Sequence, residues 1–205
     1  LLICYQLVDS FTFYSILVSI GFDSEKMMVL KGIYDRGQPL VQLGLVIASS
    51  LALAIVPVVS YRQSAKRGSE YAFVQLTYRV TLIFGVAAAV GLILVMPFVN
   101  VMLFETDRLT GTLSLYVLQI ISFSLILTMT AILQGYGKVW MPIFILAGSI
   151  VVKLVGNLIF IPLFSAFGAA ISGVIASFMA ATALIMGIRR IANGPLANGA
   201  FYMKL

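Results

Sequence analysis

An acid and a base stand side by side at Asp35-Arg36, directly before a long apolar stretch. No charged residue occurs between Gly37 and Tyr61. Because lipid cannot solvate a charge, this pair must face water, a partner helix or a ligand. An arginine can donate two parallel hydrogen bonds to a phosphate, so Arg36 is a candidate for binding a diphosphate. The alternatives are an ion pair with Asp35 or a neighbouring helix, and a contact with lipid phosphate.

Two further charged residues, Asp9 and Lys153, lie midway through apolar stretches. Each would cost about 2.5–3.5 kcal/mol at the centre of a bilayer. They are therefore candidates for lining a water-filled cavity that binds substrate or a coupling ion. Asn157 follows Lys153 by one helical turn and shares its face. The alternatives are a structural Asp9–Lys153 pair that joins two helices, and a position of Asp9 nearer a helix end.

The composition places these residues in a membrane protein. Charged residues make up 10% of the chain, against about 25% in soluble domains, and apolar residues make up 61%. The net charge of +6 comes from basic residues between apolar stretches, which favours membrane topology over nucleic-acid binding. Histidine is absent and Cys4 is the single cysteine. Neither a His/Cys metal cluster nor a Ser-His-Asp triad can form, so we expect neither an enzyme nor a metal or cofactor.

Long apolar stretches without alternation predict an all-α integral membrane fold. A spanning helix needs about 20 mostly apolar residues. The qualifying segments are residues 1–20, 38–60, 80–104, 113–133, 141–163 and 168–188. Residues 21–37 could extend the second of these helices. Small residues from Gly168 to Ala176 recur at a spacing of three and four, which predicts a helix-packing face.

Basic residues predict the orientation of six such spans. With an even number of crossings, the loops after spans two and four share one side with the tail, and they carry eight basic residues against four on the other side. The first side is therefore predicted to be cytoplasmic. Its basic residues are Arg62, Lys66, Arg67, Arg79, Lys138, Arg189, Arg190 and Lys204. The chain begins inside an apolar stretch without Met, so we expect a fragment, and residues 192–205 are predicted to be an irregular or truncated cytoplasmic tail.

The segment KGIYDRGQPLVQLGLVIASSLALAIVPVVS, from Lys31 to Ser60, resembles the eighth transmembrane helix of the MurJ/SpoVB-type flippases. These proteins belong to the multidrug/oligosaccharidyl-lipid/polysaccharide exporter superfamily, and the Gram-positive branch with its lipid II flippase is the most similar. Shorter segments at 6–12, 133–137 and 168–172 resemble it as well. The resemblance covers roughly residues 1–190, and its Asp35-Arg36 segment is the most specific part.

The resemblance implies a fold of two six-helix lobes, in which residues 1–191 are the second lobe of a MATE-like transporter. It implies a flippase of the bacterial cytoplasmic membrane that moves lipid-linked oligosaccharide diphosphates by alternating access. Arg36 matches an arginine that lines the cationic cavity of the family, with Asp35 as its neighbour. The expected partners are that lipid substrate, membrane lipids and the first lobe, which this chain lacks. The alternatives are a drug/cation antiporter of the same superfamily and a non-transporting membrane scaffold.

Overall fold

The computed structural model describes residues 2–19, 24–64, 70–105 and 109–191. All of its regular elements within these ranges are helices, in agreement with the predicted all-α class. The predicted tail, residues 192–205, lies outside the described residues. The helices are α1 (Leu2–Ser19), α2 (Ser24–Asp35), α3 (Gly37–Gly44), α4 (Val46–Ser64), α5 (Glu70–Phe104), α6 (Thr110–Val117), α7 (Gln119–Gly135) and α8 (Trp140–Ile191).

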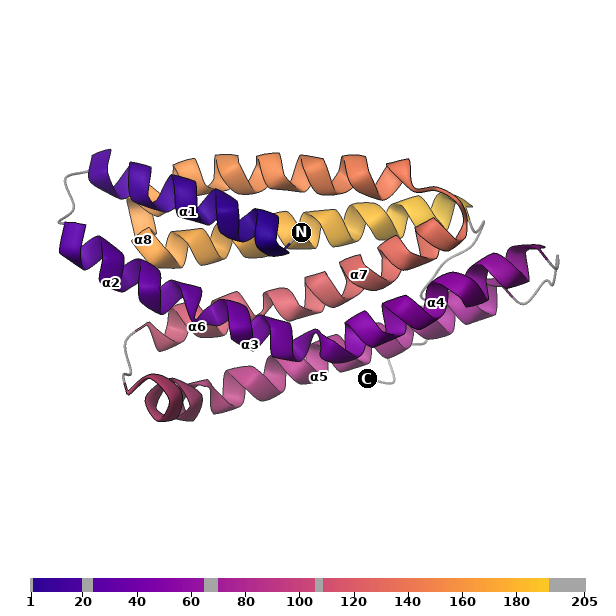
Figure 1. Cartoon of the computed structure of the whole chain (residues 1–205), viewed down its shortest axis with the longest axis horizontal. Coiled ribbons are helices and arrows are strands. Elements are labelled where there is room, and N and C mark those ends of the chain that lie inside the picture. Colours follow the sequence, from indigo (N-terminus) through magenta and orange to yellow (C-terminus); the bar gives the residue numbers. More distant parts are fainter. Residues whose placement is uncertain (1, 20–23, 65–69, 106–108, 192–205) are drawn as a thin grey trace.

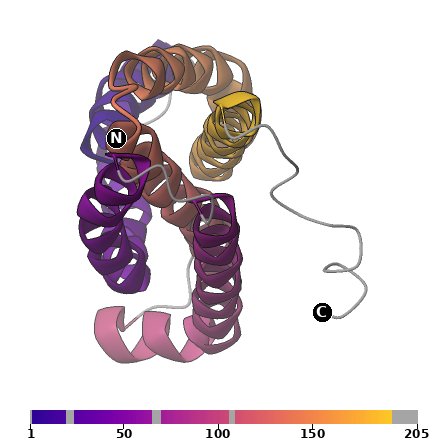
Figure 2. The same ribbon diagram turned by 90° about the vertical axis from the view of Figure 1, so that its right-hand side faces the viewer.

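Helix α7 occupies the centre of the bundle. It contacts α4, α5 and α8, while α1 packs on α8. Viewed along the bundle, α7 lies between the α1–α8 side and the α4–α5 side (Figure 2). Most of its side chains are buried, both apolar ones and hydroxyls such as Ser122, which donates to Ser177 of α8 at 2.7 Å. An all-round apolar helix needs partners on every side, and here the neighbouring helices provide them.

Helix α8 folds back on itself at Ser165, whose φ of 50° and ψ of −124° are not helical. Residues 140–164 and 166–191 form two antiparallel limbs (Figure 1). In a straight helix, residues 157 and 172 would be about 22 Å apart, yet the Ser172 hydroxyl donates to the Asn157 side chain. A Cβ on Gly168 would lie 2.0 Å from the Phe160 carbonyl oxygen, so glycine is needed for this close approach. The predicted packing face is therefore confirmed.

The second predicted span is preceded by helical residues and is broken. Residues 24–44 are almost continuously helical, with one turn residue at Arg36, and Met27–Gly44 meets Val46–Val59 at an angle of 48°. The predicted extension of the second helix is therefore found within the described residues, whereas the start of the membrane span itself stays a prediction. The charges of α2 do not end the helix, because Lys31 and Asp35 pair at a spacing of four residues along one face.

Close contacts of α3 with α6 and α7 accompany the break. A Cβ on Gly37 would lie 2.6 Å from Tyr116, and a Cβ on Gly44 would lie 2.4 Å from Ile120. Real Cβ atoms do not approach other atoms so closely. The two glycines therefore let α3 lie directly against the central helices, while α4 leaves at a different angle.

The outer surface of the bundle is apolar. Phe98 of α5 and Phe144 of α8 are 75% and 70% exposed, and many other large apolar side chains also point outward. Such a surface is costly in water and suited to lipid. Within the part of the chain that the structure describes, four helical segments are long and apolar enough to cross a membrane, or five if the bent segment is one span. The four are Leu2–Ser19, Phe73–Met102, Thr110–Gly135 and Trp140–Ile191, with α8 counted once.

The helix ends gather at two opposite ends of the bundle (Figure 1). The reversal of α8 lies at the same end as the start of α2 and the end of α5. The end of α7 and both termini of α8 lie at the other end, where Lys138, Arg189 and Arg190 are exposed. These three basic residues are thus grouped as the topology argument groups them. The assignment of this end to the cytoplasm stays a prediction.

Candidate functional site

Asp9 lies near the middle of α1 and is only 2% exposed. Its Oδ1 accepts from Lys153 Nζ at 2.7 Å and from Asn157 Nδ2 at 2.8 Å. Its Oδ2 accepts from the Tyr34 hydroxyl, also at 2.8 Å. Both carboxylate oxygens are therefore occupied, and this one side chain joins α1 to α2 and α8. The Asp9–Lys153 pair that was predicted as one alternative is therefore present, and Asp9 does not lie near an end of α1.

The ammonium group of Lys153 is also fully engaged. Besides Asp9, it donates to the Ala169 carbonyl oxygen at 2.8 Å and to Ser172 Oγ at 3.2 Å. An ammonium has three donors, so these acceptors account for all of them. Ala169 and Ser172 belong to the second limb of α8, whereas Lys153 belongs to the first. These two hydrogen bonds of Lys153 therefore also fasten the two limbs of α8 to each other.

Asn157 completes the network. Its Nδ2 donates to Thr12 Oγ1 at 2.7 Å as well as to Asp9, and its Oδ1 accepts from Ser172. We call Asp9, Tyr34, Lys153, Asn157 and Ser172 the Asp9 cluster. All five side chains are at most 2% exposed. Such a cluster can hold helices in register, and a role of its members in binding substrate stays a prediction.

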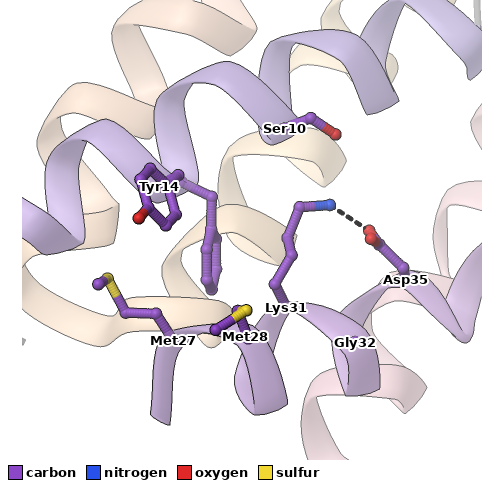
Figure 3. A pocket seen from close by; sticks show the side chains of 8 residues that line it. Ser10, Tyr14, Met27, Met28, Lys31, Gly32 and Asp35 are labelled. Carbon is purple, nitrogen blue, oxygen red and sulfur yellow. Dashed lines mark hydrogen bonds and ion pairs between the residues drawn. The ribbon is translucent and has the colours of Figure 1, made fainter. Parts of the chain in front are cut away.

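A pocket of about 440 Å³ lies next to the Asp9 cluster, between α1 and α2. Its apolar wall includes Phe13 of α1 with Met27 and Met28 of α2. Lys31 and Asp35 form its charged wall, and Figure 3 shows both on one face of α2, turned toward α1. The pocket thus combines an apolar lining with one acid and one base.

Lys31 and Asp35 form an ion pair within α2. Their side chains are 19% and 38% exposed, so water or a ligand can reach them. Lys31 Nζ also lies 5.9 Å from the centre of the Tyr34 ring, within the range of a cation–π contact. Tyr34 therefore touches both charge pairs: its ring contacts Lys31 and its hydroxyl contacts Asp9.

Arg36 lies at the junction of α2 and α3 and is half-buried. Its backbone N–H donates to the Ile33 carbonyl oxygen at 3.3 Å. It does not line the pocket between α1 and α2. The structure brings Asp9, Lys153 and Asn157 into one cluster and places Asp35 on the adjacent pocket, with Arg36 next to it along the chain.

Sequence reasoning did not single out Tyr34, Lys31 or Ser172 as site residues. For Lys31 a signal existed, because a lysine four residues before an aspartate places both charges on one helical face. For Tyr34 no local signal existed, since its partner Asp9 is 25 residues away in another helix. Among the described residues, no group of three or more His, Cys, Asp and Glu side chains has the arrangement of a metal site.

These features are those of an α-helical membrane protein with several spans: its outer surface is apolar, its helices are apolar, and the Asp9–Lys153 pair is buried inside the bundle. The chain is similar to a curated protein described as the uncharacterized membrane protein YabM of Bacillus subtilis (strain 168). The two are 38% identical over 188 residues, which cover 90% of this chain. The chain spans about a third (34%) of the length of that relative. No family model matches the chain. No solved structure matches it either.

Proposed function

We propose that this chain is one six-span lobe of a two-lobe, MATE-like flippase. The flippase moves a lipid-linked oligosaccharide diphosphate across the bacterial cytoplasmic membrane by alternating access. One crossing each for α1, α2–α4, α5 and α6–α7, with one for each limb of α8, gives the six crossings of this proposal. The other lobe belongs to the rest of the protein, and the relative is long enough to include one. The proposed activity is transport and involves no covalent chemistry.

The observation that carries the proposal is a charged segment within a broken span, beside an open pocket. Lys31, Asp35 and Arg36 lie on a helical stretch that continues through Gly44 and bends there. Charges inside a membrane-spanning segment are costly and mark ligand pathways in membrane proteins. Transporters commonly form their substrate sites from discontinuous helices near the middle of the membrane.

The sign of the charges supports an anionic substrate. Lys31 and Asp35 neutralise each other, so Arg36 gives this charged segment its net positive charge. The arginine suits a phosphate because its planar guanidinium can donate two hydrogen bonds to it. This agrees with the role that the family resemblance implies for Arg36.

The Asp9 cluster suits the moving parts of such a transporter. Alternating access is largely a rigid-body motion of one repeat against another. A network that ties α1 and α2 to both limbs of α8 keeps these helices together as one body. The same saturated network is the observation that favours the second candidate, a non-transporting scaffold, in which buried charges only pair with each other.

Replacement of Arg36 in the full-length protein tests the proposal. We expect Arg36→Ala to abolish outer-leaflet exposure of the lipid-linked precursor, and Arg36→Lys to restore it only in part, because lysine keeps the charge but not the two-pronged contact. Exposure is measured in cells depleted of every other flippase. The matched control is Arg190→Ala, an exposed residue near the end of α8. Normal exposure with Arg36→Ala at wild-type protein levels would favour the scaffold instead.

A further inference from the structure

The pocket between α1 and α2 has an unusual charge distribution. It is largely apolar, yet its polar wall holds one base and one acid rather than charges of one sign. We propose that this pocket binds an amphiphile with a zwitterionic group, whose anion contacts Lys31 and whose primary ammonium contacts Asp35. The apolar part of the ligand lies against the apolar lining of the pocket, to which Phe13 belongs and where Figure 3 shows Met27 and Met28. The inference concerns the same segment and pocket as the proposed function, but it rests on Lys31 and Asp35 rather than on Arg36.

The accessibility of the pair argues for a ligand. Both side chains remain partly exposed and face the pocket, in contrast to Lys153, which is 1% exposed. A charge pair that other side chains do not seal has room for an additional polar partner.

The mixed sign argues for a zwitterion. A purely anionic group would have to separate Lys31 from Asp35 and would leave the carboxylate beside another negative charge. A purely cationic group would also separate the pair, and it would leave the ammonium of Lys31 beside another positive charge. A group with both signs replaces the internal pair by two external pairs, so neither protein charge is left without a counter-charge. Charge complementarity therefore selects a phosphate or carboxylate together with an amine.

The walls of the pocket are suited to this ligand. The Tyr34 ring lies 5.9 Å from Lys31 Nζ and is itself held by the hydrogen bond to Asp9 and by stacking on Phe13, 6.1 Å between centroids. The cationic side of the site is thus positioned before ligand arrives, which reduces the entropic cost of binding. Methionine side chains adapt to chains of varied shape, so Met27 and Met28 fit an acyl or prenyl tail.

The test uses full-length protein in detergent micelles and two short-chain lipid probes that differ only in the headgroup. Phosphatidylethanolamine carries the phosphate and a primary ammonium, whereas phosphatidylglycerol carries the phosphate alone. We expect the first to bind about tenfold or more tightly than the second, because it alone fills both contacts. Native mass spectrometry or equilibrium dialysis measures the difference. Equal binding of both probes would overturn the proposal.

Substitutions of the two charged residues test whether the lipid binds in this pocket. Lys31→Met and Asp35→Asn should each weaken phosphatidylethanolamine binding about tenfold, and Asp35→Asn should leave phosphatidylglycerol binding unchanged or stronger. The exchanged pair Lys31→Asp with Asp35→Lys should still bind, since a zwitterion can enter in the opposite orientation. Lys138→Met, at an exposed lysine in the turn after α7, is the matched control and should bind normally. Unchanged binding with both single variants would place the lipid elsewhere and overturn the proposal.

The zwitterion can come from a membrane phospholipid or from an amine-bearing headgroup of a lipid-linked precursor. Competition separates these two sources. Displacement of the phosphatidylethanolamine probe by a precursor with a free amine, but not by its N-acetylated form, identifies the precursor as the ligand. A probe that neither form displaces identifies the phospholipid. Because the readout is binding, it is independent of whether Arg36→Ala impairs transport.

Discussion

Two acid–base pairs lie close together in this molecule and have different surroundings. Asp9 and Lys153 are 2% and 1% exposed, and other protein groups occupy every hydrogen-bonding position of the ammonium and both carboxylate oxygens. Lys31 and Asp35 are 19% and 38% exposed and border a pocket. The same chemistry is therefore used once to fasten helices and once to form an accessible polar wall.

The comparison of the two pairs indicates that an ionisable residue within a span is not by itself a ligand site. What separates the two pairs is the number of partners. A buried pair is tolerated only when further hydrogen bonds satisfy it, and those bonds leave nothing for a ligand. Tyr34 lies between the two regions and contacts one pair through its hydroxyl and the other through its ring.

The largest effect is expected from breaking the buried pair. Lys153→Met should lower the free energy of unfolding by about 3–5 kcal/mol, because Asp9 is left as an uncompensated buried charge. Unfolding of full-length protein in mixed micelles measures the loss. The charge exchange Asp9→Lys with Lys153→Asp should recover part of it. A loss below about 1 kcal/mol would contradict the structural role.

The next effect tests the packing that brings the Asp9 cluster together. Gly168→Ala should cost about 3 kcal/mol, at the upper end for overpacking, because the new Cβ would meet backbone atoms of Phe160 that cannot move aside. Gly148→Ala is the matched control in the same helix, since nothing lies within 4 Å of its Cβ position. The stability of both variants is measured by unfolding in micelles. Equal stability would show that Gly168 does not lie directly against the backbone of Phe160.

The sequence predicted the fold class and part of the buried network. Long apolar stretches were sufficient for an all-helical membrane protein, and a spacing of four residues was sufficient to place Asn157 beside Lys153. The cost of burial predicted that Asp9 and Lys153 were special, and it allowed a structural pair as one alternative. These inferences depend on local pattern and on the solvent, which the sequence specifies.

The remaining features depend on contacts between distant residues. The reversal at Ser165 brings Ser172 to Asn157, and no local pattern fixes how tightly such a turn closes. The break lies where Gly44 closely approaches Ile120, which is 76 positions later in the chain. The number of spans, the two-lobe architecture and the substrate stay predictions.

A smaller effect is expected at the residue that joins the two regions. Tyr34→Phe removes the donor to Asp9 Oδ2 and should cost about 1–2 kcal/mol, because that oxygen is buried and loses a hydrogen bond to a charged group. The control is Tyr14→Phe, a 54% exposed tyrosine on the pocket wall, which should cost almost nothing. Urea or detergent titration of both variants gives the difference. Equal stability of the two would mean that Tyr34 does not hold α2 to the cluster.

The smallest effect on stability is expected when lysine is replaced by methionine in the Lys31–Asp35 pair, the counterpart of Lys153→Met. Lys31→Met should lower the free energy of unfolding by only about 0.5 kcal/mol, since partly exposed pairs four residues apart on a helix contribute little. The new side chain would lie beside Met27 and Met28 on an apolar wall, which limits the loss further. The comparison with Lys153→Met in one titration is direct, because the chemical change is identical and only the surroundings differ. A loss as large as that of Lys153→Met would mean that the pocket pair also fastens helices, and it would remove the distinction between the two regions.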